Sequence, residues 1–241
     1  MKATPYDRGF FRSIKGGSVR SARTVVPVVL SLLGPQSVAD VGCGTGAWLS
    51  VVRELGIDDV LGIDGDYVDR RRLLIPPDRF IAADVANGVN VSRRFDVVFS
   101  LEVAEHIAPD RSDVYLDNLV KLSDSIVFSA AVPGQRGTGH VNEQWPEYWQ
   151  ERFAARGYRA IDCLRPRFWR DRSVEPWYRQ NLFLYVNETV ILQRPELLQE
   201  DAGRTLSLVH PALFMEGSFA QVLRLMTGIF VRDLRLKLKK P

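Results

Sequence analysis

The stretch "VADVGCGTGAWL", residues 38–49, indicates the fold of this chain. A short apolar run leads into Gly42, Gly44 and Gly46, and a second apolar run then opens a helix. Glycine lets the backbone turn tightly and lets a ligand approach without a Cβ in the way. Such strand–turn–helix units are typical of doubly wound α/β folds, which bind ligands at the carboxyl ends of their strands. Two alternatives stay open: a tight turn without a ligand, and a dinucleotide fingerprint in "GCGTGA".

The rest of the chain repeats this alternation of strands and helices. An apolar helix ends at Gly34, and short, continuously apolar runs of the kind buried on both faces of a sheet then alternate with helical or loop stretches. The pattern predicts a mostly parallel, doubly wound sheet of seven strands, in which the last two runs could form an antiparallel hairpin at the edge. The runs are residues 37–41, 59–64, 80–85, 95–101, 125–131, 158–164 and 181–187.

Length and composition narrow the class of protein. The 241 residues suffice for one large α/β domain, so we expect that domain over 1–187, with N-terminal helices, and a helical extension over 188–241. The net charge of +3 gives no reason to expect a nucleic-acid partner. The two cysteines lie far apart without CxxC spacing, which suits a reducing compartment. Without an apolar leader or a membrane-length run, a cytoplasmic location is expected.

Three acids accompany the glycine turn. Asp40 precedes the first glycine by two positions, where it can fix the turn and reach a ligand ammonium through water. Asp64 ends the second predicted strand, where a carboxylate can accept both hydroxyls of a ribose. Asp84 ends the third, where it can accept from an adenine amino group. A solvated strand end is the simpler interpretation of each acid alone, but three at successive strand ends indicate a nucleoside site.

At these residues the sequence resembles the class I S-adenosylmethionine-dependent methyltransferases. "VADVGCGTGAWL" is similar to their first motif, "VLGIDGDYV" to their ribose-binding strand end, "AADV" to the adenine-contacting turn and "FDVVFSLEVAEHI" to their fourth-strand motif. The resemblance covers roughly residues 20–187 and implies a Rossmann-like methyltransferase fold with S-adenosylmethionine as cofactor. An Asp two residues before the first glycine is unusual in nicotinamide enzymes, so an NAD-dependent dehydrogenase is the weaker interpretation. The implied cofactor contacts are Asp40, Gly42, Gly44, Gly46, Asp64, Asp84, Val85 and Leu101.

A second group of polar residues follows the fourth predicted strand, in "SLEVAEHIA" (100–108). If a helical turn begins at Glu102, then Glu102, Glu105 and His106 stand at i, i+3 and i+4 and share one face. His140 follows the fifth predicted strand in a glycine-bracketed loop, which in a doubly wound sheet can overhang the same edge. We therefore expect His140 to meet the other three residues.

Two carboxylates and two imidazoles match a divalent-metal site. The segment also resembles that of the small-RNA 3′-terminal 2′-O-methyltransferases, which carry "EVxEH" and a later His followed by Glu and Trp, and that of the ubiquinone-pathway O-methyltransferases. The resemblance implies a metal, Mg or Mn, on Glu102, Glu105, His106 and His140, binding vicinal hydroxyls of the acceptor. Direct acid–base or substrate contact without metal, and structural pairing at a helix start, remain alternatives.

The family implies methyl transfer by in-line displacement, for which a hydroxyl acceptor must lose a proton. We take His140, His106 and Glu102 as the catalytic residues. Near them in the sequence, Asn142 and Glu143 are candidate hydroxyl partners, and Trp145 and Trp169 are candidates for an aromatic wall that suits a sugar ring. Core packing is the simpler role for each tryptophan. A cluster of arginines within 165–172 is either a solvated loop or a clamp for an acidic group.

The C-terminal stretch 219–241 has apolar residues at helical spacing followed by a basic tail. It is expected to pack on the sheet or on a second subunit in a homodimer, with peripheral membrane contact and nucleic-acid contact as alternatives.

The segment "HVNEQWPEYW" (140–149) resembles that of chains that tailor glycans or secondary metabolites. With the methyltransferase motifs, this resemblance implies an O-methyltransferase that acts on a sugar or polyol hydroxyl in glycan or secondary-metabolite biosynthesis. An RNA-terminal 2′-O-methyltransferase, a dehydrogenase and a binding protein without catalysis are its rivals.

Overall fold

The computed structural model describes residues 8–201, 207–210 and 213, with the side chains of 8–15 excluded. The chain divides into two compact units, Met1–Leu208 and Val209–Pro241, and the first contains the sheet. Seven strands form this one sheet, as predicted, in the order β3-β2-β1-β4-β5-β7-β6. The strands are β1 (Ser37–Val41), β2 (Asp59–Asp64), β3 (Phe80–Ala82), β4 (Val97–Leu101), β5 (Ser125–Ser129), β6 (Tyr158–Ile161) and β7 (Phe183–Asn187).

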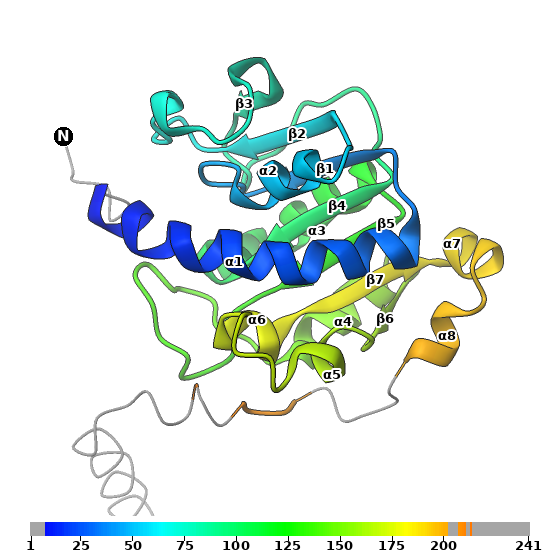
Figure 1. Ribbon diagram of the computed structural model, residues 1–241. Coiled ribbons are helices and arrows are strands. Elements are labelled where there is room, and N and C mark those ends of the chain that lie inside the picture. Colours follow the sequence, from blue (N-terminus) through cyan, green and yellow to red (C-terminus); the bar gives the residue numbers. More distant parts are fainter. Residues whose placement is uncertain (1–7, 202–206, 211–212, 214–241) are drawn as a thin grey trace, which may run out of the picture. The chain divides into compact units, whose positions relative to one another are not determined.

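Helices and short 3-10 turns connect the strands, so that the chain alternates between the two as the sequence predicts (Figure 1). The α-helices are α1 (Arg8–Leu33), α2 (Ala47–Glu54), α3 (Ser112–Leu122), α4 (Pro146–Ala154), α5 (Arg165–Phe168), α6 (Pro176–Asn181), α7 (Glu188–Gln193) and α8 (Leu197–Glu200). The 3-10 turns are η1 (Arg70–Arg72), η2 (Pro77–Arg79), η3 (Ala104–His106) and η4 (Pro109–Arg111).

Strand pairing places the carboxyl ends of the central strands at one edge of the sheet. β1 pairs in parallel with β2 on one side and with β4 on the other, and β4 pairs in parallel with β5. β7 runs antiparallel to both β5 and β6, which confirms the expected edge hairpin. The residues that follow β1, β2, β4 and β5 therefore gather at the carboxyl ends of the parallel strands.

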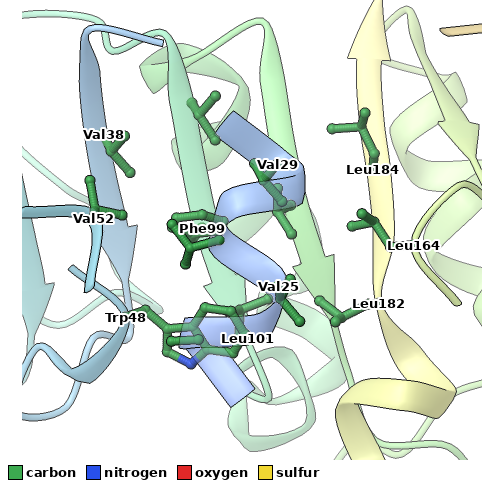
Figure 2. Packing of buried hydrophobic residues seen from close by; sticks show 14 of the residues in the cluster. Val25, Val29, Val38, Trp48, Val52, Phe99, Leu101, Leu164, Leu182 and Leu184 are labelled. Carbon is green, nitrogen blue, oxygen red and sulfur yellow. The ribbon is translucent and has the colours of Figure 1, made fainter. Parts of the chain in front are cut away.

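Apolar layers cover both faces of the sheet. On one face, α1 and α2 pack on the strands through residues such as Val25, Val29 and Val52 (Figure 2). Trp48 of α2 lies in this layer, 5.8 Å from the Phe99 ring between ring centres. The opposite face is covered by α3 and α4, whose buried side chains include Tyr115, Leu119, Trp149 and Phe153. Two covered faces explain why the strand sequences are continuously apolar rather than alternating.

The structure corrects two details of the predicted elements. β3 ends at Ala82, two residues before Asp84, so this carboxylate stands in a turn and does not end the strand. No helical turn begins at Glu102, because this residue has a left-handed backbone (φ +56°) and the one-turn helix η3 covers Ala104–His106.

At the other end of the chain, α7 and α8 belong to the first compact unit. The expected helix within 219–241 lies outside the described residues. Within the described ranges, no helix is both long and apolar enough to cross a membrane.

Candidate active site

The glycine turn, residues 42–46, joins β1 to α2 and lies against the end of β2. The N–H groups of Gly42 and Cys43 donate to the Ile63 carbonyl of β2, at 2.7 and 3.2 Å. Gly42 has φ +85°, and a Cβ there would lie 2.3 Å from Cγ2 of Val103. This position therefore requires glycine for its backbone conformation and for its close contact.

Two buried carboxylates flank the glycine turn. Asp64 accepts from the N–H groups of Gly44 and Gly65, both at 2.6 Å, and from the Tyr67 hydroxyl. Burial raises the pKa of Asp64 although these three hydrogen bonds oppose the shift. Asp40 is 2% exposed, and burial followed by the charge of Asp64 raises its pKa well above the usual range. The structure thus brings these two predicted residues together, and it adds Tyr67, which the sequence analysis missed.

The remaining predicted cofactor residues lie in the turn after β3 and at the end of β4. Asp84 is exposed, and its carboxylate accepts from the N–H of Ala86 at 3.0 Å and from Nδ2 of Asn87 at 2.6 Å. Val85 beside it is half-buried. Leu101 is buried at the end of β4. Asp84 therefore shapes its own turn, as Asp and Asn side chains commonly do.

Glu102 follows β4 and is held from three directions. Its N–H donates to the carbonyl and the hydroxyl oxygen of Ser129, at 3.0 and 3.1 Å. Its Oε2 accepts from Nε2 of Gln135 at 2.7 Å, and its Oε1 accepts from Nδ2 of Asn181 at 3.1 Å. Burial raises the pKa of Glu102, and these donors partly offset the shift. The sequence analysis missed Gln135 and Asn181, which are distant in the chain and carry no motif.

Three of the four predicted metal ligands form a compact group, which we call the acid–histidine cluster: Glu105, His106 and His140. Each offers one ligand atom, and these atoms lie within 4.8 Å of one another; Glu102 is not in the group. The carboxylate of Glu105 is fully buried and makes no hydrogen bond of normal geometry among the described residues. Burial, and then the charge of Glu102, raises the pKa of Glu105 well above its usual range.

The two imidazoles of the cluster meet edge to face, with ring centres 4.9 Å apart. Nε2 of His140 lies 4.0 Å from Oε1 of Glu105. Nδ1 of His106 lies 3.2 Å from the carbonyl of Gly139. Burial lowers the pKa of His106, which favours the neutral ring that can ligate a metal or accept a proton.

Glu143 and Gly137 set the position of His140. Oε1 of Glu143 accepts from Nδ1 of His140 at 2.8 Å and from the Arg136 N–H at 2.7 Å, while Oε2 accepts from the Gly134 N–H at 2.8 Å. Although burial opposes the shift, these three donors lower the pKa of Glu143. The imidazole lies so close to Gly137 that a Cβ there would be 2.1 Å from Nε2. Glu143, predicted as a substrate contact, here orients an imidazole, as second-sphere carboxylates do at metal sites.

The other predicted acceptor residues divide into buried and accessible ones. Asn142 is buried and donates from Nδ2 to the Ser112 hydroxyl at 3.0 Å, so it supports the loop from within. Trp145 is 41% exposed, whereas Trp169 is half-buried. Of the predicted arginine clamp, Arg165 is buried in a bidentate ion pair with Asp162, at 2.9 and 2.6 Å, and is therefore committed to the fold.

A seven-stranded sheet of this order, with a glycine turn and acidic strand ends at its ligand-binding edge, defines a class I S-adenosylmethionine-dependent methyltransferase. More particularly, a family model described as a methyltransferase domain matches residues 20–169. The match covers more than half of the chain, and this chain belongs to that family. The dehydrogenase alternative is thereby set aside. No curated protein sequence matches the chain.

Solved structures with a similar fold include sugar-modifying enzymes. The sugar N-methyltransferase KedS8 from Streptoalloteichus sp. shares 18% identity over 78% of this chain and 95% of its own, with a TM-score of 0.60. CalS10, an amino pentose methyltransferase from Micromonospora echinaspora with S-adenosylmethionine bound, shares 16% over 78% and 100%, with a TM-score of 0.55. The methyltransferase domain of bacterial CtHen1-C shares 16% over 70% and 98%, with a TM-score of 0.53. At these identities the likeness shows the fold alone.

Proposed function

We propose that this methyltransferase transfers the methyl group to a hydroxyl oxygen of a sugar or polyol, with a divalent metal held by the acid–histidine cluster. One observation carries the proposal: the Glu105 carboxylate is fully buried and makes no hydrogen bond of normal geometry among the described residues, with the imidazoles of His106 and His140 beside it. A buried carboxylate without partners is costly unless it binds a cation or carries a proton. One carboxylate and two imidazoles can hold a divalent cation; the carboxylate suits Mg²⁺ or Mn²⁺, whereas the imidazoles suit transition metals, so Mn²⁺ fits this donor set better than Mg²⁺.

The side chains around the cluster fit the deprotonation of a hydroxyl. His140 is oriented through Nδ1 by Glu143, which leaves Nε2 toward Glu105. When a metal is bound, Nε2 of His140 would be one of its ligands, so the acceptor's proton passes to water while the hydroxyl oxygen attacks the methyl carbon about 3 Å away. A divalent metal, when bound here, would lower the pKa of a coordinated hydroxyl. The exposed Trp145 offers an apolar face that suits a sugar ring.

Two of the similar folds, KedS8 and CalS10, are described as sugar N- and amino pentose methyltransferases. A sugar nitrogen is therefore the competing acceptor. An amino group that has already lost its proton can attack the methyl carbon without a metal. A requirement for metal at the acid–histidine cluster would thus distinguish O-methylation from N-methylation.

The test is a screen of radiolabelled methyl transfer from S-adenosylmethionine into neutral sugars, amino sugars, lipid-linked glycans and RNA, with Mg²⁺, with Mn²⁺ and after exhaustive chelation. We expect label on a sugar or polyol hydroxyl, loss of transfer on chelation and about one metal ion per chain by elemental analysis. Glu105→Gln should lose both the metal and the transfer while it still binds S-adenosylmethionine. Transfer to nitrogen, or full activity without metal, would reject the proposal.

A further inference from the structure

The loop between β5 and α4 carries an arginine in a conformation that this residue seldom adopts. Arg136 has φ +62°, in the left-handed region that favours glycine. Glycines stand two residues before it and directly after it, at Gly134 and Gly137. The backbone at this position would suit a further glycine better than arginine, and strained residues of this kind gather at functional sites. The conformation therefore favours a function for the arginine side chain.

Arg136 borders the acid–histidine cluster. Its N–H donates to Oε1 of Glu143 at 2.7 Å, and the same oxygen accepts from Nδ1 of His140 at 2.8 Å. Gly137, the next residue, lies so close to the imidazole that an added Cβ would be 2.1 Å from Nε2. This nitrogen lies 4.0 Å from Oε1 of Glu105. A ligand held at the cluster is therefore within reach of the long Arg136 side chain.

The charge of Arg136 is not neutralised within the described part of the chain. The side chain is exposed, and no carboxylate there forms an ion pair or a hydrogen bond with its guanidinium. Glu143, the one acid between β5 and α4, is already occupied, because its Oε2 accepts from the Gly134 N–H at 2.8 Å and its Oε1 from the two groups named above. A guanidinium offers a planar fork of N–H donors that matches a carboxylate or a phosphate. Arg136 thus has an unused set of donors for an anion from outside the chain.

Two further arginines leave positive charge at this edge of the sheet. β6 and β5 both run antiparallel to β7, so the segment that follows β6 lies at the same edge as the loop that follows β5. In that segment Arg170 and Arg172 are exposed and form no ion pair among the described residues. Asp171 between them is occupied by Ser173, whose N–H and hydroxyl both donate to its Oδ1, at 2.9 and 2.6 Å.

The opposite edge of the sheet differs in this respect. At the amino ends of the strands, Arg93 forms a bidentate ion pair with Asp59, at 2.8 and 2.6 Å. Arg94 pairs with Asp124, which directly precedes β5. Arginines at the amino ends thus have acidic partners, whereas those named above, at the edge that carries the candidate site, keep their charge for a ligand.

We propose that Arg136 binds an anionic group, a phosphate or a carboxylate, on the sugar or polyol whose hydroxyl meets the acid–histidine cluster. Arg170 and Arg172 add positive charge to the same edge and attract the anion over a longer range. The inference rests on the proposed function and narrows its acceptor to an acidic sugar, such as a sugar phosphate or a uronic acid. A neutral sugar would leave the Arg136 guanidinium without a partner.

The test is an NMR titration of the full chain with glucose, glucose 1-phosphate and glucuronate, in a chelator and with saturating S-adenosylhomocysteine. Chelation keeps the phosphate from binding a metal, and S-adenosylhomocysteine fills the cofactor site. Wild-type protein should bind one of the acidic sugars about 10- to 100-fold more tightly than glucose, since the contacts are charge-assisted hydrogen bonds. Tighter binding of glucose 1-phosphate identifies a phosphate, and tighter binding of glucuronate identifies a carboxylate.

Variants of Arg136 assign this preference to its side chain. Arg136→Gln should bind all three sugars as weakly as glucose, and Arg136→Lys, which keeps the charge but not the fork, should retain part of the preference. Arg136→Gly suits φ +62° and should match Arg136→Gln in binding while it raises the melting temperature. The control is Lys121→Gln, which removes the same charge from an exposed residue in the last turn of α3 and should leave all affinities unchanged.

Equal binding of the three sugars by wild-type protein overturns the inference without any variant. A preference that persists in Arg136→Gln and Arg136→Gly, or that falls equally in Lys121→Gln, overturns it as well. Neither metal nor methyl transfer enters this experiment, so its failure would leave the O-methylation proposal standing. Conversely, transfer to nitrogen or without metal would reject that proposal and leave the measured preference for an acidic sugar unchanged.

Discussion

The two halves of this site are built differently. The half predicted to bind the cofactor consists of the glycine turn, Asp40 and Asp64, all within residues 40–64 and on two paired parallel strands. Its contacts are mainly backbone N–H groups, as in the hydrogen bonds that Asp64 accepts from Gly44 and Gly65. The acid–histidine half draws on separate stretches around Glu105, His140 and Asn181, and side chains make most of its contacts.

Because of this difference, the two halves should respond differently to mutation. A site made of backbone depends on the conformation of a few residues, and a single Cβ can destroy it. A site made of side chains from distant segments depends on a network, and its members can be removed one at a time with graded effects. A single substitution in the glycine turn should therefore abolish most of the function of its half, whereas substitutions in the acid–histidine half should each remove part of the activity.

The largest effect is expected from Gly42→Ala. The change forces a side chain onto a residue at φ +85° and puts its Cβ 2.3 Å from Val103. A shift of about 1 Å in a substrate-positioning segment costs about 100-fold in turnover, and we expect at least this loss together with weakened S-adenosylmethionine binding in calorimetry. Gly56→Ala is the matched control, because Gly56 has φ +94° but no atom within 4 Å of the added Cβ. It should cost about 1–3 kcal/mol of stability and leave the cofactor affinity intact. Similar affinities in the two variants would refute the close-contact argument.

The second-largest effect is expected in the acid–histidine half. His140→Ala removes one of the proposed metal ligands and should lower the turnover rate by about 10- to 100-fold, while the affinity for S-adenosylmethionine stays the same. Gly137→Ala should reproduce part of this loss, because its Cβ would lie 2.1 Å from Nε2 of His140 and displace the ring. Gly134→Ala strains the same loop at φ +90°, with no atom within 4 Å of the added Cβ, and keeps the N–H that donates to Glu143. If it slowed methyl transfer as much as Gly137→Ala, loop strain rather than the imidazole would explain the loss.

The sequence was informative where structure is local. The glycine turn and its acids could be predicted because strand ends and turn residues carry their meaning within a few positions. The seven strands and the edge hairpin followed from the same periodicity and were confirmed. β3 was placed too long, since the apolar run continues through a turn that Asp84 shapes by its own hydrogen bonds.

Only the outline of the acid–histidine half could be predicted from the sequence. Glutamate seldom adopts the left-handed conformation. The sequence around Glu102 therefore gave no sign of the left-handed residue that stands where a helical turn was expected. Its partners Gln135 and Asn181 lie 33 and 79 residues away, and only the fold brings them together. Glu143 was recognised as polar and near the site, but its three donors come from its own loop and give it a supporting role.

A smaller effect is expected on the stability of the metal-free protein. Burial, and then the charge of Glu102, raises the pKa of Glu105 in the folded state above its unfolded value. The folded protein then binds more protons than the unfolded chain, so the free energy of unfolding falls as the pH rises above the ordinary glutamate pKa, about 4.3. Glu105→Gln removes this dependence and should stabilise the chelated protein at pH 8 by about 1–3 kcal/mol.

Urea unfolding at pH 4.5 and pH 8, each with a chelator, measures this difference. The advantage of Glu105→Gln should shrink toward the lower pH, because wild-type Glu105 is then protonated and also neutral. Asp40 and Asp64 remain in both proteins and contribute the same background slope. Parallel stability curves for the two proteins at both pH values would show that the buried charge of Glu105 is compensated in solution.

The smallest effect should come from Trp145, the exposed aromatic residue at the start of α4. An aromatic contact with a sugar ring contributes about 0.5–1.5 kcal/mol, so Trp145→Ala should raise KM for the acceptor by about two- to tenfold and leave kcat and cofactor affinity unchanged. Trp145→Phe keeps an aromatic face and should recover most of the loss. Leu192→Ala, at a side chain that is 76% exposed and on α7, serves as the surface control. A fall in kcat instead of a rise in KM would show that Trp145 supports the His140 loop and does not contact the acceptor. The acid–histidine half would then depend on one more side chain than its hydrogen bonds indicate.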